Sequence, residues 1–192
     1  PVEMSRYESS FHEKLVHFQC DNNAGSIASV IAKLQLMPVN LTEVFICNGV
    51  LHGENITPEK RLADFDEQSF ASVIKANTVT PILWLQQLMS IFNKKSQAKV
   101  VVFSARVGSI SDNKLGGWYS YRASKAALNM LIKTAAIEYK RMFKLVKLVA
   151  FHPGTTDTQL SKPFQKNVPA GKLFTPEFVA KQLLARLPTI EA

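Results

Sequence analysis

Short apolar runs alternate along the chain with longer stretches in which apolar residues recur every three or four positions. The short runs predict strands, because the buried strands of a parallel sheet are almost continuously apolar. The longer stretches predict helices, two of which have start signals at Asp66 and at Thr175-Pro176. The predicted strands are residues 15–20, 41–47, 100–104 and 145–151, and the predicted helices are residues 26–34, 66–88, 119–141 and 175–187.

This alternation predicts an α/β fold in which helices cover both faces of a parallel sheet. Ligands bind such sheets at the carboxyl ends of the strands. Surface loops are polar in any protein, but here every predicted strand is followed by polar or glycine-containing sequence. These segments are residues 21–23, 48–49, 104–109 and 152–158. We therefore expect a ligand site at this edge of the sheet.

Tyr121 and Lys125 lie four positions apart in the predicted helix 119–141, so their side chains share one face. The ordinary pKa of a tyrosine phenol is near 10, which is too high for a base at neutral pH. A lysine ammonium one turn away favours the phenolate, lowers that pKa and makes the phenol a general acid/base. The alternative is an exposed Tyr–Lys pair on a helix surface, and the glycine-containing loop before the helix favours the functional interpretation.

Asn77 lies in the middle of the predicted helix 66–88, where asparagine has a poor propensity. Pro81, four residues later, has no N–H to donate to the Asn77 carbonyl. The helix is therefore expected to kink here, and the freed carbonyl needs another partner, for which a bound water is suited. The alternative is a proline kink without a functional role.

Taken together, these features resemble the short-chain dehydrogenase/reductase family, in its C-factor-like and sniffer-like branch. The resemblance extends from about Leu15 to Leu187. It implies a Rossmann-type doubly wound sheet and a reversible hydride transfer between NAD or NADP and a small-molecule carbonyl/alcohol substrate. The segments that carry it are Asn77, residues 104–110, residues 116–129 and the Pro153-Gly154 turn.

The resemblance also implies a role for each matching residue. Tyr121 corresponds to the catalytic acid/base, and Lys125 to the group that lowers its pKa and holds the nicotinamide ribose. Asn77 corresponds to the helix asparagine whose main chain positions a relay water. The remaining cofactor-binding positions are Asp21 and Asn22 beside the adenine, Asn48 and Gly49 in a degenerate Asn-Asn-Ala-Gly motif, and Pro153, Gly154, Thr156 and Thr158 around the nicotinamide carboxamide.

One departure from the family concerns the catalytic serine, which polarises the substrate carbonyl by hydrogen bonding. This position, three residues before the loop glycine, is Ala105. The neighbouring Ser104 is expected to point to the other face of its strand, whereas Ser109 can turn towards the site. Ser109 is therefore a candidate catalytic residue; the alternative is that no hydroxyl replaces the missing one and turnover is slow or altered.

A second departure is that the family's glycine-rich phosphate loop has no counterpart. The 14 residues before Leu15 contain no glycine, although this loop would have to follow the first strand and open the first helix. The chain also stops before the family's last strand. We expect residues 1–192 to form a single Rossmann-like domain that is incomplete at both ends; a truncated relative that lost cofactor binding is the alternative.

Composition narrows the remaining classes of function. The net charge of +8 suits an anionic dinucleotide, and the absence of a basic stripe interleaved with aromatics argues against nucleic acid. Arg6 and the positive net charge slightly favour NADP over NAD, because NADP carries an additional 2′-phosphate. The four histidines lack metal-ligand spacing, so we expect no metal, and the two cysteines are interpreted as packed residues. No apolar run is long enough for a membrane span. By resemblance we expect a cytoplasmic homodimer or homotetramer.

A second hypothesis is a non-catalytic signalling or interaction protein on the same fold. It is motivated by Ala105, by the missing glycine loop and by the likeness to the C-factor branch, which is named for cell–cell signalling.

Overall fold

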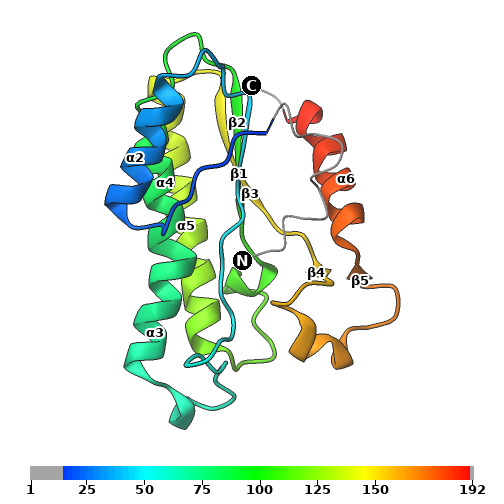
Figure 1. The fold of residues 1–192 in the computed structure, drawn as a ribbon. Coiled ribbons are helices and arrows are strands. Elements are labelled where there is room, and N and C mark those ends of the chain that lie inside the picture. Colours follow the sequence, from blue (N-terminus) through cyan, green and yellow to red (C-terminus); the bar gives the residue numbers. More distant parts are fainter. Residues whose placement is uncertain (1–14, 191–192) are drawn as a thin grey trace.

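The computed structural model describes residues 15–190 and centres on a three-stranded parallel sheet (Figure 1). The strand order is β1-β2-β3, so each crossover joins neighbouring strands. Two further short strands, β4 and β5, form a separate parallel pair. The strand bounds are Glu43–Ile46 for β1, Ala98–Phe103 for β2, Val146–Phe151 for β3, Thr155–Thr156 for β4 and Leu173–Phe174 for β5.

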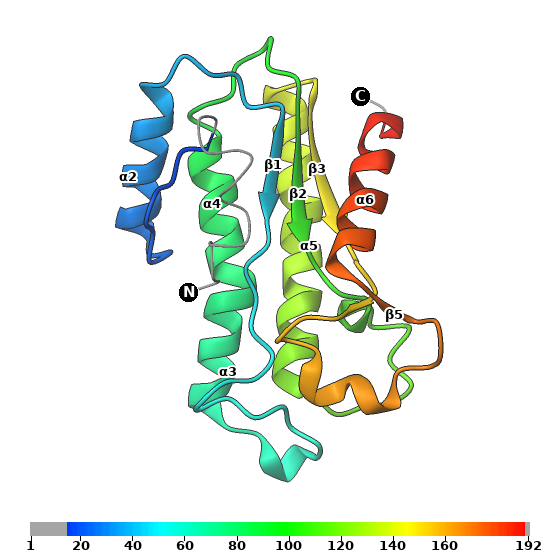
Figure 2. The same cartoon turned by 45° about the vertical axis from the view of Figure 1, so that its right-hand side comes forward.

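Helices lie on both faces of the sheet (Figures 1 and 2). α2, α4 and α5 cover one face and α6 covers the other, which confirms the predicted α/β architecture. The helix bounds are Ala24–Gln35 for α2, Glu67–Ile74 for α3, Thr80–Leu88 for α4, Tyr119–Met142 for α5 and Pro176–Arg186 for α6; shorter 3-10 turns occupy Leu62–Asp64, Arg106–Gly108, Lys162–Asn167 and Leu187–Thr189.

The core has two parts because β2 is buried on both faces. Val100 and Val102 pack with the helices α2, α4 and α5, whereas Val101 packs with Leu183 and Leu187 on the α6 side. All three valines of β2 are 0% exposed. Fully burying such a side chain contributes roughly 1.5–3 kcal/mol, so the apolar run of β2 anchors both helix layers to the sheet.

The local start signals predicted two helices correctly. The Asp66 carboxylate accepts the Ser69 N–H at 2.7 Å at the start of α3. The Thr175 hydroxyl accepts the Phe178 N–H at 3.2 Å at the start of α6. These caps satisfy N–H groups that have no partner inside the helix.

The predicted helix 66–88 forms, but a π-helical segment at Lys75–Val79 separates α3 from α4. In this segment the Thr80 N–H bonds to the Lys75 carbonyl, one residue further back than in an α-helix. Pro81 follows directly and has no N–H to continue the α-helical ladder. The disturbance expected at Asn77 is therefore a π-bulge within a continuous helical rod.

The strand predicted at residues 15–20 is wrong, since this segment has no regular structure. A strand needs a neighbour that pairs with its backbone, and no strand of residues 15–190 lies beside it. Leu15 and Val16 are 50% and 59% exposed, and only Cys20 at the end of the run packs against the core. Its apolar composition alone does not form a strand without a pairing partner.

Over residues 15–190, no helix combines the length and the apolar character needed to cross a membrane.

Candidate active site

The loop after β1 is tied to the π-helical segment by three hydrogen bonds. The Asn48 side chain donates to the Ala76 carbonyl at 2.7 Å. The Asn77 side chain accepts the Val50 N–H at 2.6 Å and donates to the Val50 carbonyl at 2.8 Å. The Asn77 side chain thus bonds to both backbone groups of Val50, as a neighbouring strand would. This fixes the backbone of the loop after β1.

Asn77 also reaches α5, which makes it the centre of the site's support. Its side chain is 0% exposed, and its amide donates to the Ser124 hydroxyl at 3.1 Å. The adjacent Thr78 hydroxyl donates to the Ser124 carbonyl at 2.8 Å. Sequence reasoning assigned Asn77 a role through its main chain, whereas the side chain links three separate elements.

Tyr121 and Lys125 are buried in the first turns of α5, 9% and 3% exposed. The Lys125 ammonium donates to the carbonyl of Phe103, the last residue of β2, at 2.9 Å and lies 5.9 Å from the centre of the Tyr121 ring. The predicted pair is therefore inside the protein, and the alternative of an exposed surface pair is wrong.

Gly49, in the loop after β1, lies beside both Asn77 and Lys125. A Cβ atom at Gly49 would lie 3.5 Å from the Asn77 side-chain oxygen and 3.6 Å from the Lys125 ammonium. The structure therefore brings Gly49, Asn77, Tyr121 and Lys125 together at the carboxyl end of the sheet, as predicted.

The pKa values differ from the sequence expectation. Burial raises the pKa of Tyr121 to about 12 and lowers the pKa of Lys125 to about 8. The reason is geometric: the ammonium lies over the ring and bonds to the Phe103 carbonyl, so loss of solvent outweighs its attraction for the phenolate. At neutral pH this arrangement holds Tyr121 as a neutral phenol.

The loop after β2 presses closely on α5. A Cβ at Gly108 would lie 2.6 Å from the Lys125 carbonyl carbon and 2.8 Å from its oxygen, so only glycine fits there. Ser104 is buried and donates to the Asn129 side chain at 2.6 Å.

Ser109 is held within its own loop. Its hydroxyl lies 3.3 Å from the Ser111 hydroxyl and accepts the Asp112 N–H at 3.4 Å. Its proposed role beside Tyr121 stays a prediction.

The loop after β3 contains a buried hydroxyl without a partner. Thr156 Oγ1 is the one buried side-chain polar atom among residues 15–190 that makes no hydrogen bond. Its strand β4 pairs with β5, and Gly154 has φ +77° with its absent Cβ 2.7 Å from the Phe174 ring. Pro153 precedes this turn, and Thr158 donates to the Thr156 carbonyl at 3.4 Å. An orphaned buried hydroxyl favours a polar ligand here.

Asp21 and Asn22 lie apart from these residues, at the start of α2. Asp21 accepts hydrogen bonds from Asn23 at 2.7 Å and from the Ser26 hydroxyl, and the Ser26 bond is the main cause that lowers its pKa. Asn22 has φ 61° and accepts the Trp84 indole N–H at 3.0 Å. α2 starts at the end of the sheet towards which the strands point (Figure 2), so both residues flank the same edge.

Sequence reasoning missed Glu59. It is 4% exposed and bonds to the first residues of α5, 61 positions later. No local motif around Glu59 indicates a functional role, because its hydrogen-bond partners come from a distant segment of the chain. Over residues 15–190, no cluster of three or more His, Cys, Asp or Glu side chains has the arrangement of a metal site.

Residues 12–169 match the family described as short chain dehydrogenase. The chain belongs to this family. Over 165 residues, the chain is 30% identical to 1-hydroxy-2-glutathionyl-2-methyl-3-butene dehydrogenase of Rhodococcus sp. (strain AD45), covering 86% of this chain and 67% of that protein. It is 28% identical to the C-signal of Myxococcus xanthus, covering 53% of this chain and 60% of that protein. The chain thus spans about two thirds or less of the length of these relatives.

Solved structures confirm the short-chain dehydrogenase fold. The NADPH-bound carbonyl reductase from chicken fatty liver aligns with a TM-score of 0.76 at 22% identity, covering 97% of this chain and 75% of that one. The carbonyl reductase Sniffer of D. melanogaster aligns with a TM-score of 0.69 at 20% identity, covering 86% and 66%. The C-signal and the Sniffer reductase are thus among the proteins to which this chain is similar.

The described residues fit the nicotinamide end of a dinucleotide. Lys125 offers a donor beside Gly49, which has no side chain, and Thr156 offers an unpartnered hydroxyl for a carboxamide. Arg6, which favours NADP in the sequence, lies outside the described residues.

Proposed function

We propose that the chain is the catalytic part of an NAD(P)-dependent oxidoreductase that interconverts a small carbonyl compound and its alcohol. The observation that carries this proposal is the buried Tyr121–Lys125 pair beside Gly49 and Asn77, at the ligand edge of a short-chain dehydrogenase sheet. Burying a lysine and a tyrosine inside the protein is costly, and residues with perturbed pKa values are typical of functional sites.

In the direction of reduction, Tyr121 donates its phenolic proton to the carbonyl oxygen as negative charge develops there. A pKa of about 12 keeps the proton on Tyr121 at neutral pH, so the acid is present before each turnover. A bound nicotinamide cofactor supplies the hydride. Lys125 stays anchored on the Phe103 carbonyl and presents its remaining protons to the cofactor ribose.

The cofactor is proposed to be NADP or NAD, with NADP favoured by the net charge of +8. The relatives support this choice, since solved structures that share the fold include NADPH-bound and NADP-bound proteins. Asn48, Gly49, Thr156 and Thr158 would hold the nicotinamide half, and Asp21 and Asn22 the adenine. The protein is proposed to act in the cytoplasm as a homodimer or homotetramer.

Fluorescence titration of the full-length protein with NADPH and NADH tests the proposal. We expect saturable quenching or energy transfer with one cofactor at micromolar concentration, and cofactor-dependent reduction of a panel of ketones and aldehydes. Absence of binding for both cofactors at millimolar concentration would refute the enzyme proposal.

A second candidate is a signalling or interaction protein that does not turn over substrate. It is favoured by Ala105, which offers no hydroxyl where the family places one, and by the local contacts of Ser109. The variant Ala105→Ser separates the two. If the site is catalytic, restoring the hydroxyl raises kcat by roughly tenfold or more, because one such donor is worth a large part of carbonyl activation. No turnover in wild type and in Ala105→Ser favours the binding protein.

A further inference from the structure

The turn before α5 is held in a backbone conformation that one of its residues disfavours. Gly116, Gly117 and Trp118 have φ values of 65°, 63° and 51° in succession. Glycine adopts such angles freely, but a tryptophan in this region is strained and persists only when its surroundings fix it. Trp118 lies edge-to-face with Tyr121, at 6.1 Å between ring centres. The strained turn therefore sets the position of groups beside the proposed acid/base.

Glu59 fixes this turn from one side. Its backbone carbonyl accepts the Trp118 N–H at 2.6 Å. Both of its carboxylate oxygens lie 3.2 Å from the Ser120 N–H, and the carboxylate also accepts the Ser120 hydroxyl. No side chain at the start of α5 itself caps the helix. Glu59 thus supplies the missing cap from a distant loop, through hydrogen bonds to the N–H and hydroxyl of Ser120.

Arg122 fixes the turn from the other side. Its guanidinium donates to the Gly117 carbonyl at 2.9 Å and to the Gly116 carbonyl at 3.1 Å. The Gly116 and Gly117 carbonyls are therefore held by Arg122, whereas the Trp118 N–H is held by the Glu59 backbone carbonyl. These bonds from two separate residues fix the left-handed turn.

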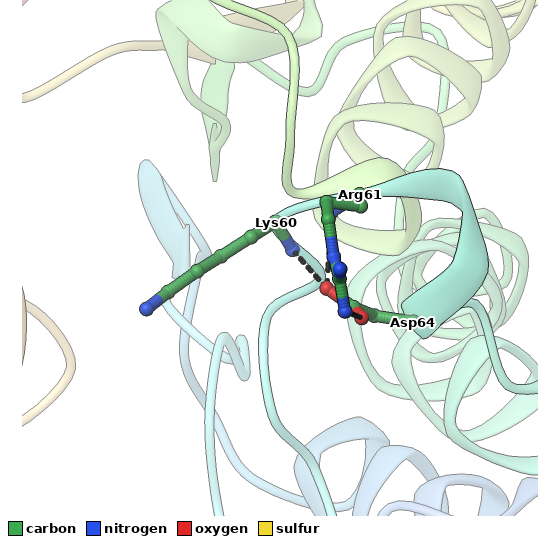
Figure 3. Close-up of polar contacts among 3 residues, drawn as sticks. All are labelled: Lys60, Arg61 and Asp64. Carbon is green, nitrogen blue, oxygen red and sulfur yellow. Dashed lines mark hydrogen bonds and ion pairs between the residues drawn. The ribbon is translucent and has the colours of Figure 1, made fainter.

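The backbone directly after Glu59 is held in place by the Asp64 side chain. The Asp64 carboxylate accepts the N–H groups of Lys60 and Arg61 at 3.3 Å and 3.1 Å, and its other oxygen accepts the Arg61 guanidinium at 2.9 Å (Figure 3). These bonds fix the backbone that follows Glu59. A cavity of only about 10 Å³, lined by Glu59, Ser120 and Tyr121 among others, leaves room for one water at most.

From this geometry we propose that Glu59 is a positioning residue, which holds the first turn of α5 so that Tyr121 meets the substrate oxygen. The inference rests on the proposed function, because it assigns Tyr121 the role of acid/base. Glu59 acts through Ser120 and Trp118, the residues on either side of the helix start, and does not exchange a proton with the substrate. A misplacement near 1 Å of a reacting group can cost about 100-fold in rate, so the cap is coupled to turnover.

Three variants of the full-length protein test this role. Glu59→Ala removes the carboxylate and leaves the Ser120 N–H and hydroxyl without partners. Glu59→Gln keeps an acceptor for the N–H, and its amide can donate to the Ser120 hydroxyl instead. Glu54→Gln removes an exposed carboxylate from the same loop and is the matched control. We measure kcat, the Kd of NADPH and the near-UV circular dichroism in a Trp84→Phe background, which leaves Trp118 as the one tryptophan of residues 1–192.

We expect Glu59→Ala to lower kcat by roughly 10- to 100-fold, to leave the Kd of NADPH within threefold and to flatten the Trp118 signal. Glu59→Gln is expected to keep kcat within threefold of wild type together with the signal, as is Glu54→Gln. Equal loss of kcat in Glu59→Gln and Glu59→Ala would overturn the proposal, since the charge and not the bonded position would then matter. Unchanged kcat and dichroism in Glu59→Ala would also overturn it.

Two further results keep the test decisive. If Glu59→Ala does not fold, Ser120→Ala removes the hydroxyl arm from the other side; a kcat reduced by about three- to tenfold supports the proposal, and an unchanged kcat overturns it. If the wild type binds cofactor but turns over no substrate, the proposed function fails while the dichroism of Trp118 still decides whether Glu59 holds the turn.

Discussion

Two regions flank the ligand edge of the sheet, and they are held by different kinds of contact. In the region around Asn77 and Tyr121, side chains bond across long stretches of sequence, such as Asn77 to Val50 and to Ser124. In the region of residues 15–23, most bonds are local, such as those of Asp21 to Asn23 and Ser26. The first region is therefore fixed by the tertiary fold, and the second mainly by the first turn of α2.

This difference explains why only one region forms as the apolar pattern predicts. The strands β1, β2 and β3 pair with one another in the sheet, and this pairing holds the loops that follow them in place. Residues 15–20 have a comparable apolar pattern but no strand beside them among residues 15–190, and they stay irregular. A sequence pattern becomes a strand only when the fold supplies its neighbour.

The largest expected effect comes from breaking the long-range contacts of Asn77. Asn77→Ala leaves the Val50 N–H, the Val50 carbonyl and the Ser124 hydroxyl short of a partner, which we expect to lower the free energy of unfolding by about 4 kcal/mol. Asn23→Ala, in the locally held region, is the matched control and should cost about 1 kcal/mol for its local bonds to Ser26 and Asp21. Urea unfolding measures both, and equal losses would contradict the comparison.

A somewhat smaller effect is expected where the loop after β2 contacts α5. Gly108→Ala places a methyl group 2.6 Å from the Lys125 backbone, which neither element can avoid without moving. We expect a loss of about 3 kcal/mol in the free energy of unfolding and a fall in turnover. Gly53→Ala is the control, because nothing lies within 4 Å of its Cβ position, and it should be neutral. A stable, fully active Gly108→Ala would show that the close approach is not required.

The smallest expected effect on stability concerns pH and the buried Lys125. Its pKa is about 8 in the folded chain against an ordinary value of 10.5, so between these pH values the folded chain holds fewer protons than the unfolded one. Stability should therefore rise as pH increases from about 8 to 10, by about 2 kcal/mol. Comparing unfolding of wild type and Lys125→Met over this range isolates the effect. The same slope in both proteins would contradict the assignment.

The sequence predicted the parts of the site that depend on spacing and local chemistry. Tyr121 and Lys125 share a helix face because they are one turn apart, and Asn77 disturbs its helix because Pro81 follows it. Sequence did not predict Glu59, whose partner lies 61 residues away, or the raised pKa of Tyr121, which comes from burial. Both depend on what tertiary packing places around a group, and no local pattern encodes that.

The central claim is that Tyr121 is the acid/base of a nicotinamide-dependent site, and Tyr121→Phe tests it most directly. The substitution removes the phenolic oxygen and keeps the ring that packs against Trp118. We predict that NADPH binds to the full-length variant with a Kd within threefold of wild type, while ketone reduction falls by about 100-fold or more. Full ketone reduction by Tyr121→Phe would contradict the account.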